Sequence, residues 1–261
     1  MYYSSGLEYI VDSYSSNSYS GVGYFSRNID NNYDFRLDNP IIFETKYAGN
    51  SRKTIQYRTE HEYKVIPYTN HSFAPEIFLS LSRPKARFIE DDNEIKNFVE
   101  ETFELMMKEK LPGNISINIL PFDEFKAIHS RFGAWSNGIL GFSINGDDKQ
   151  IFAVENHLDA LMMVIGHEIG HVLTDALPNK HDEEAKAFAF SIEWAKNIKK
   201  HNIANLGLSI KDELDFQPAR NGLHDVAFSF VGIMLNKGRR AIDLHSDLVK
   251  KYTSIFDKLY F

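Results

Sequence analysis

The sequence contains no cysteine, no apolar run long enough to cross a membrane and no excess of positive charge. Without cysteine the chain has no disulfide, no thiolate ligand for a metal and no cysteine-based zymogen switch. Its longest apolar stretch, Val226 to Leu235, is far shorter than the roughly 20 residues of a membrane span. The amino terminus also lacks the basic start and apolar segment of a signal peptide. We therefore expect a protein of the reducing cytoplasm with no membrane partner.

The charge balance argues against nucleic acid as a partner. The formal net charge is −7 at pH 7, and the isoelectric point is about 5.8. An acidic chain has no general attraction for a phosphate backbone. Hydrophobic residues make up 43% of the chain and charged residues 25%, which is ordinary for a globular protein. The length of 261 residues predicts one large domain or two small ones.

Three regions are expected along the chain. Residues 1–39 are rich in Ser, Tyr and Asn, which predicts a flexible arm that serves either as a packing tail or as a pro-segment. Residues 40–90 are expected to form a β-rich accessory region, with strand candidates at 41–43, 54–65 and 77–81. Residues 91–261 are expected to form the main domain.

The main domain is predicted to have an α+β fold. A helix is expected from Asp91 or Asp92 to just before Leu111, because Ile95, Val99 and Met106 form an apolar stripe. Periodicity and turn residues then predict a strand at 115–120, a short helix at 122–131 and a hairpin of strands 138–144 and 150–154. Longer helices are expected at 156–177 and after 181, and an amphipathic helix is expected at 239–261.

The segment His-Glu-Ile-Gly-His at 167–171 says most about function. In a helix, His167 and His171 lie one turn apart on the same face, so both imidazoles can reach one Zn²⁺ ion. Glu168 stands beside the first histidine, where it can act as general base on a metal-bound water. Gly166 and Gly170 are poor helix formers, and they indicate that another element packs closely on this helix.

A catalytic zinc site needs a third protein ligand and one open position. The metzincin pattern is excluded, because Thr174 and Leu177 stand where its Gly and third His would be. The remaining candidates are His181, Asp182, Glu183 and Glu184. Helical geometry ranks Glu184 first, since it shares a face with Phe188, and turns Glu183 nearly to the opposite face. Some of these four residues are instead expected to cap the helix that follows.

These motifs resemble the gluzincin peptidases, and most closely the ImmA/IrrE-type family. Its second motif has the form Glu-x-x-Ala-Asn-x-Phe-Ala, and Ala185, Phe188 and Ala189 match it. The resemblance implies a zincin-like metallopeptidase domain with an active-site helix and a small mixed sheet. It also implies that the leading acid of the second motif is the third ligand. That position falls on Asp182, and the usual Asn is Lys186; a shift of one or two residues would select Glu183 or Glu184.

The expected function is zinc-dependent hydrolysis of a protein or peptide substrate. His224, next to Asp225, and Arg220 are candidates for stabilising the oxyanion. The hairpin at 138–154 precedes the motif helix, and the small residues Gly138 and Gly141 would let a substrate backbone approach it. The alternatives are a zincin-fold regulatory or binding protein with little hydrolysis, and a latent protease whose site is covered by the arm or the last helix.

Overall fold

The structure is a computed structural model that describes residues 8–10, 39–47, 50–58, 73–136, 138–216 and 222–260. For 8–10, 39–47, 50–58 and 258–260 it describes the backbone alone. Residues 1–7 and 11–38 of the predicted arm lie outside the described residues, as does Arg220. The described part combines helices with small sheets, which confirms the predicted α+β class.

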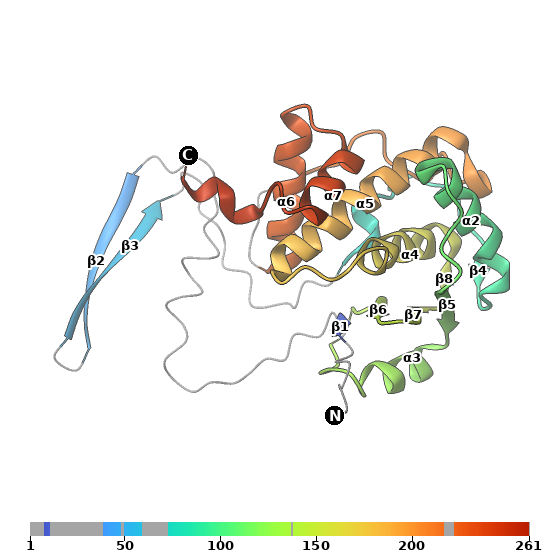
Figure 1. The fold of residues 1–261 in the computed structure, drawn as a ribbon, viewed down its shortest axis with the longest axis horizontal. Helices are drawn as coiled ribbons and strands as arrows, with labels where there is room; N and C mark the ends of the chain where they lie inside the picture. The colour runs from blue at the N-terminus through green and yellow to red at the C-terminus, as the bar shows by residue number, and fades with distance from the viewer. Residues whose placement is uncertain are drawn as a thin grey trace, which may run out of the picture.

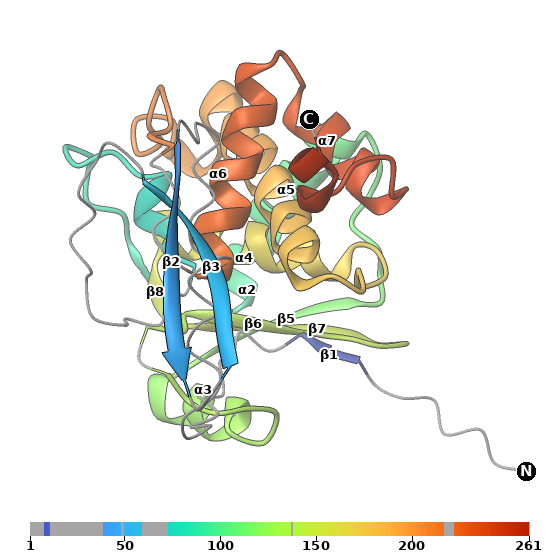
Figure 2. The same cartoon turned by 90° about the vertical axis from the view of Figure 1, so that its left-hand side faces the viewer.

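A mixed sheet in the order β1-β6-β7-β5 lies between helices on its two faces (Figures 1 and 2). Its strands are β1 (Glu8–Ile10), β5 (Ile115–Leu120), β6 (Gly141–Asn145) and β7 (Lys149–Val154). β5 is parallel to β7, β6 is antiparallel to β7, and β1 is antiparallel to β6. The three predicted strands of the main domain are therefore confirmed, although β6 begins at Gly141 rather than at Gly138.

The side chains of β6 and β7 alternate between two cores, because successive residues of a strand point to opposite faces. On one face, α3 (Phe122–His129) and the sheet form a small core of Phe125, Ile139, Phe142, Ile144, Phe152 and Val154. On the other face, α4 (Leu158–Val172) packs on Ile151 and Ala153 of β7. This second core is the larger one, and it contains the candidate site.

Helix α5 (Lys180–His201) is the centre of the helical layer. It packs against α4, and also against three other helices: α2 (Asn93–Met107), α6 (Leu223–Asn236) and α7 (Ala241–Val249). Because neighbours surround α5, almost every residue from Glu183 to Ile192 is buried, whatever its polarity. From Glu183 to Ile192 this helix has no solvent-facing side on which charged residues could be placed.

Two glycines of α4 allow the close contact with α5. A Cβ atom on Gly166 would lie 2.5 Å from Cδ1 of Trp194, and one on Gly170 would lie 2.9 Å from Cα of Ala187. Such distances are far inside van der Waals contact, so any larger residue would push the helices apart. The prediction that another element packs closely on the motif helix is confirmed.

Three sequence predictions of secondary structure were wrong in extent or type. The strand expected at 77–81 is instead a 3₁₀ turn, η1 (Pro75–Ile77), followed by an isolated bridge between Leu79 and Ile210. The helix expected at 156–177 is shorter, because Asn156–His157 form β8, which pairs with β4 (Phe88–Ile89). The helix expected at 239–261 ends at Val249, after which Lys251 has a φ of 58°.

The remaining elements are short. A 3₁₀ helix, η2 (Ile203–Asn205), follows α5, and η3 (Ile255–Tyr260) follows α7. β2 (Asn39–Tyr47) and β3 (Asn50–Arg58) pair as an antiparallel hairpin within the predicted β-rich region. The end of that region packs into the main core through Phe73, Phe78 and Ile89. Among the described residues, no helix is long and apolar enough to cross a membrane.

His245 on α7 predicts an acid-sensitive step in stability. Its ring is buried against Phe190, and burial, with the nearby charge of Lys186, lowers its pKa to about 4. Unfolding restores the ordinary pKa of about 6.5, so the unfolded chain binds a proton that the folded chain does not. The stability that this difference contributes is present above pH 6.5 and is lost as the pH falls towards 4.

We expect His245→Gln to flatten this dependence. Between pH 7 and pH 5, wild type should lose about 2 kcal/mol more of its unfolding free energy than the variant. Urea titrations of both proteins with a chelator present would measure the difference, because other titrating groups cancel in the comparison. Equal losses would show that His245 does not titrate as its burial implies.

Candidate metal centre

His167 and His171 face each other from successive turns of α4. Their Nε2 atoms are 3.3 Å apart, and their rings are nearly perpendicular, at 89°. Both side chains are buried. The i and i+4 spacing therefore brings two imidazole nitrogens to one point, as the sequence predicted.

Glu184 of α5 completes a triangle with these two nitrogens. Its Oε2 atom is 3.4 Å from Nε2 of His167 and 3.7 Å from Nε2 of His171. Ligand atoms held at about 2.0–2.1 Å from a tetrahedral metal are roughly 3.4 Å from one another. Among the four acidic-segment candidates, the structure brings Glu184, the residue ranked first by helical geometry, to the histidine pair.

The partners of the other ring nitrogens fix the tautomers of the two histidines. Nδ1 of His171 lies 2.9 Å from Oε1 of Glu183, a carboxylate oxygen that can only accept. Nδ1 of His167 lies 3.3 Å from Oγ of Ser191, whose hydroxyl donates to the carbonyl of Ala187 at 2.7 Å. Both Nδ1 atoms therefore carry a proton, so each imidazole in its neutral form directs its Nε2 lone pair into the triangle.

This arrangement could hold a cation. Two lone pairs and a carboxylate oxygen converge, and Oε2 of Glu184 is buried without a well-formed hydrogen bond from the described residues. Glu168, Glu183 and Glu184 are all buried, and Lys186 is the buried cation beside them. If these groups are ionised, two negative charges remain, which a divalent ion would balance. The donor set of two imidazoles and one carboxylate suits Zn²⁺.

The pKa of His171 shows that the carboxylates around it favour a positive charge at this position. Burial by itself would lower the pKa of this imidazole. The carboxylates of Glu184, Glu183 and Glu168 outweigh burial and raise the pKa of His171 to about 9. A proton and a metal ion therefore compete for the same electron pairs.

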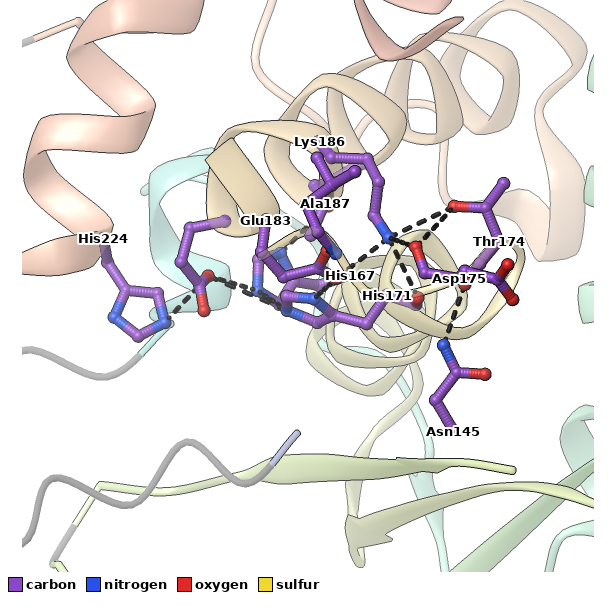
Figure 3. Close-up of polar contacts among 12 residues, drawn as sticks. Asn145, His167, His171, Thr174, Asp175, Glu183, Lys186, Ala187 and His224 are labelled. Carbon is purple, nitrogen blue, oxygen red and sulfur yellow. Dashed lines mark hydrogen bonds and ion pairs between the residues drawn. The ribbon is translucent and has the colours of Figure 1, made fainter. Parts of the chain in front are cut away.

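Glu183 corrects one expectation from the sequence. It was predicted to point almost away from the site, yet it is buried and ties three groups together (Figure 3). Besides His171, its Oε1 accepts from Nζ of Lys186 at 2.9 Å, and its Oε2 accepts from the amide of Leu177 at 2.7 Å. The prediction was wrong because α5 is covered on several sides, so a residue 100° away from Glu184 still faces the end of α4.

Lys186 closes this network from α5. Its ammonium group lies 3.2 Å from the carbonyl of His171, 3.2 Å from Oγ1 of Thr174 and 3.3 Å from the carbonyl of Asp175. The carbonyls in the last turn of a helix have no partner within the helix and carry its negative dipole end. Lys186 therefore caps α4 while it neutralises Glu183 (Figure 3).

Asp182 and His181 have other contacts. The carboxylate of Asp182 accepts from the Ser254 hydroxyl and the Ile255 amide, both at 2.8 Å, and so holds the C-terminal segment. The ring of His181 packs edge-on against Phe256. The acid position carried over directly from the ImmA/IrrE pattern thus faces away from the histidines. If the leading Glu of the second motif is aligned with Glu184, its Ala falls on Ala187 and its Phe on Phe190. The usual Asn position then falls on Phe188.

His224 reaches the cluster from the start of α6. Its Nε2 atom is 3.2 Å from Oε2 of Glu184. His167, Glu184 and His224 could also hold an ion, since their ligand atoms lie within 4.8 Å of one another. The ring centroids of His167 and His224 are 6.1 Å apart, compared with 4.8 Å for His167 and His171. Both sets share His167 and Glu184, so His171 and His224 are the two candidates for the third ligand.

The predicted substrate-side residues occupy two different positions. Gly141 is buried where β6 crosses α4, and a Cβ atom there would lie 3.1 Å from Oε1 of Glu168. Gly138 lies in the exposed loop before β6, with a φ of 100° that suits glycine. Only Gly141 is therefore beside the predicted general base.

Sequence reasoning missed Ser191, Lys186 and Phe73 as parts of the site. Phe73 stacks on the ring of His167, with centroids 4.1 Å apart. A signal for two of them was present, because Lys186 and Ser191 are isolated polar residues within the apolar run that follows Glu184. No family model, curated protein or solved structure matches this chain.

Proposed function

We propose that the protein is a zinc-dependent metalloendopeptidase of the zincin type. The observation that carries the proposal is the convergence of Nε2 of His167, Nε2 of His171 and Oε2 of Glu184, with Glu168 adjacent in the same helix. Such a set leaves one coordination position open for water, whereas structural zinc sites normally close all four positions with protein ligands.

The residues have distinct roles in the proposed reaction. Bound zinc would polarise the scissile carbonyl and lower the pKa of water from about 15.7 towards 7. Glu168 would accept a proton from the attacking water and donate it to the leaving amine. Glu183 and Ser191 would hold the two imidazoles in the tautomer and orientation that binding requires.

The position of Gly141 supports a peptide substrate. β6 is in contact with α4, and it meets Glu168 at a residue without a side chain. An extended peptide paired with β6 through main-chain hydrogen bonds would therefore pass close to the general base.

The burial of the site favours one other candidate function. His167, Glu168, His171, Glu184 and His224 are all 3% exposed or less. A regulatory or binding protein with a zincin fold needs no path from substrate to metal, so it could retain such a closed site. Dependence of hydrolysis on Glu168 separates the two functions.

Metal content tests the proposed site. We expect about one zinc per chain in wild type purified without added metal, and little in His171→Ala or Glu184→Gln, because each removes one of three ligands. Asp182→Asn is the matched control, because it also replaces a carboxylate by an amide, two residues before Glu184. The side chain of Asp182 binds Ser254 and not the histidines. Mass spectrometry of the purified proteins measures all four. No zinc in wild type after reloading would contradict the proposal.

His224→Gln should lower kcat by about 10²-fold while zinc content and KM stay close to wild type. The imidazole lies beside Glu184, where it could stabilise the charge that develops on the substrate oxygen, and loss of one such donor has an effect of this size. Steady-state kinetics with a fluorogenic peptide would measure it. Loss of zinc from His224→Gln would show instead that His224 is a metal ligand.

A further inference from the structure

β1 occupies the outer edge of the sheet next to the candidate site. It pairs antiparallel with β6 in a register that places Glu8 opposite Asn145, Tyr9 opposite Ile144 and Ile10 opposite Ser143. β7 takes the other edge of β6, so β1 lies at the end of the sheet order. Figure 2 shows β1 within the layer of the sheet, which separates α3 from α4 and α5.

β6 lies along the motif helix from the general base to the helix end. At its start, Gly141 is packed against Val164 and Glu168. At its end, the side-chain amide of Asn145 donates to the carbonyl of Thr174 at 2.8 Å. Ser143, the partner of Ile10, is only two residues from Gly141. β6 therefore passes Glu168 at its Gly141 end, and β1 covers the edge of the same strand two residues further on, from Ser143 to Asn145.

An unpaired strand edge accepts one extended chain at a time, because each of its amides and carbonyls forms a single ladder bond. The first 38 residues are dominated by Ser, Asn, Tyr and Gly, and Leu7-Glu8-Tyr9-Ile10-Val11 is a run rich in strand-forming residues within them. Because Glu8–Ile10 belongs to the same chain, its pairing with β6 is intramolecular and does not depend on the protein concentration.

We propose that Glu8–Ile10 is an intramolecular competitor for the peptide-binding edge of β6, which keeps the site latent. This inference rests on the proposed peptidase function and adds its regulation. A peptide substrate must displace β1 before it can pair along β6 beside Glu168. Release of β1, by a partner or by cleavage of the chain that follows it, exposes the edge without any change in the metal ligands.

Competition of this kind has a defined kinetic signature. If β1 occupies the edge nine-tenths of the time, only about one-tenth of the molecules are competent to bind, and the apparent KM rises about tenfold. The rate constant kcat is unchanged, since a bound substrate has already displaced β1. A merely structural role for β1 would instead lower stability or kcat when the strand is disrupted.

The test uses the full chain with Tyr9→Pro/Ile10→Pro. Proline cannot donate a ladder hydrogen bond, so it weakens strand pairing. Ser15→Pro/Ser16→Pro is the matched control, with the same change outside β1. We expect the β1 variant to show faster hydrogen exchange in β6 with or without zinc, and a KM about tenfold lower at unchanged kcat. A synthetic peptide of residues 6–12, added to the β1 variant, should restore the high KM.

The outcomes separate this inference from the proposed function. Unchanged exchange in β6, or equal KM values in wild type and the β1 variant with Glu168-dependent hydrolysis present, would overturn the inference alone. No hydrolysis in any protein, with faster exchange in the β1 variant, would overturn the peptidase function and its latency together, leaving β6 as a peptide-binding edge.

Discussion

Glu168→Gln should abolish measurable hydrolysis while the protein keeps about one zinc per chain. Glutamine has the same shape as glutamate, but it cannot accept the proton of the attacking water. Glu168 is also absent from the triangle formed by His167, His171 and Glu184, so its replacement removes no ligand. A general base contributes about 10²–10⁴-fold to the rate, which corresponds to roughly 3–5 kcal/mol of transition-state stabilisation.

The measurement combines kcat/KM on an unfolded protein substrate with zinc content by mass spectrometry. The matched control is Glu193→Gln, an acid on α5 that lies outside the metal cluster. It should retain wild-type activity. Equal activity of Glu168→Gln and wild type would contradict the peptidase mechanism. If neither wild type nor Glu168→Gln hydrolyses the substrate although both bind zinc, the regulatory or binding function is favoured.

The metal-binding half of the site could be predicted from sequence because it depends on local geometry. The spacing of His167 and His171 within one helix fixes their relative position, and the glycines at 166 and 170 indicate a close neighbour. The leading rank of Glu184 came from the same argument, applied to the face that it shares with Phe188. The structure brings Glu184 to the histidine pair, with its oxygen within 3.7 Å of both.

The rest of the site depends on contacts between elements, which periodicity does not reveal. Glu183 was assigned to an outward face because a helix at a surface has one, but α5 is enclosed by α4, α6 and α7. The contact of His224 with Glu184 joins residues from two helices that are far apart in sequence. Likewise, the pairing of β1 with β6 spans more than half of the chain.

The secondary-structure errors have local causes of the same kind. The segment at 77–81 has an apolar composition typical of a strand, but Pro75 starts a 3₁₀ turn, and only Leu79 finds a bridge partner, Ile210. The helix expected at 239–261 has a continuous apolar stripe. It is interrupted because Asp182 binds Ser254 and Ile255 and draws that segment towards the start of α5.

Lys186→Met should be the most destabilising of the substitutions considered, at about 3–5 kcal/mol of unfolding free energy. Removing one partner of a buried ion pair leaves the other charge uncompensated. Here the charge left behind is Glu183, whose carboxylate is 2.9 Å from Nζ of Lys186, is only 5% exposed and keeps His171 and the Leu177 amide as its remaining partners. The carbonyls of His171 and Asp175 lose the same donor.

Urea titration of the zinc-free protein measures this loss, and two further variants define its origin. Lys199→Met makes the same change on the same helix, but its partner Asp212 is 91% exposed. Such a surface pair contributes less than about 1 kcal/mol. Glu183→Gln/Lys186→Met removes both charges of the pair, and it should be more stable than Lys186→Met alone because Glu183 no longer carries a buried charge without Lys186.

The same three proteins show what the buried pair does for the metal. If Lys186 acts only as a cap on α4, the double variant should recover little stability, since the carbonyls still lack their donor. If it acts mainly through Glu183, stability should return while zinc affinity stays about 10–100-fold weaker, because a glutamine in place of Glu183 is a poorer acceptor for Nδ1 of His171. We expect the second outcome, because one atom, Oε1 of Glu183, accepts from both Nδ1 of His171 and Nζ of Lys186 at 2.9 Å.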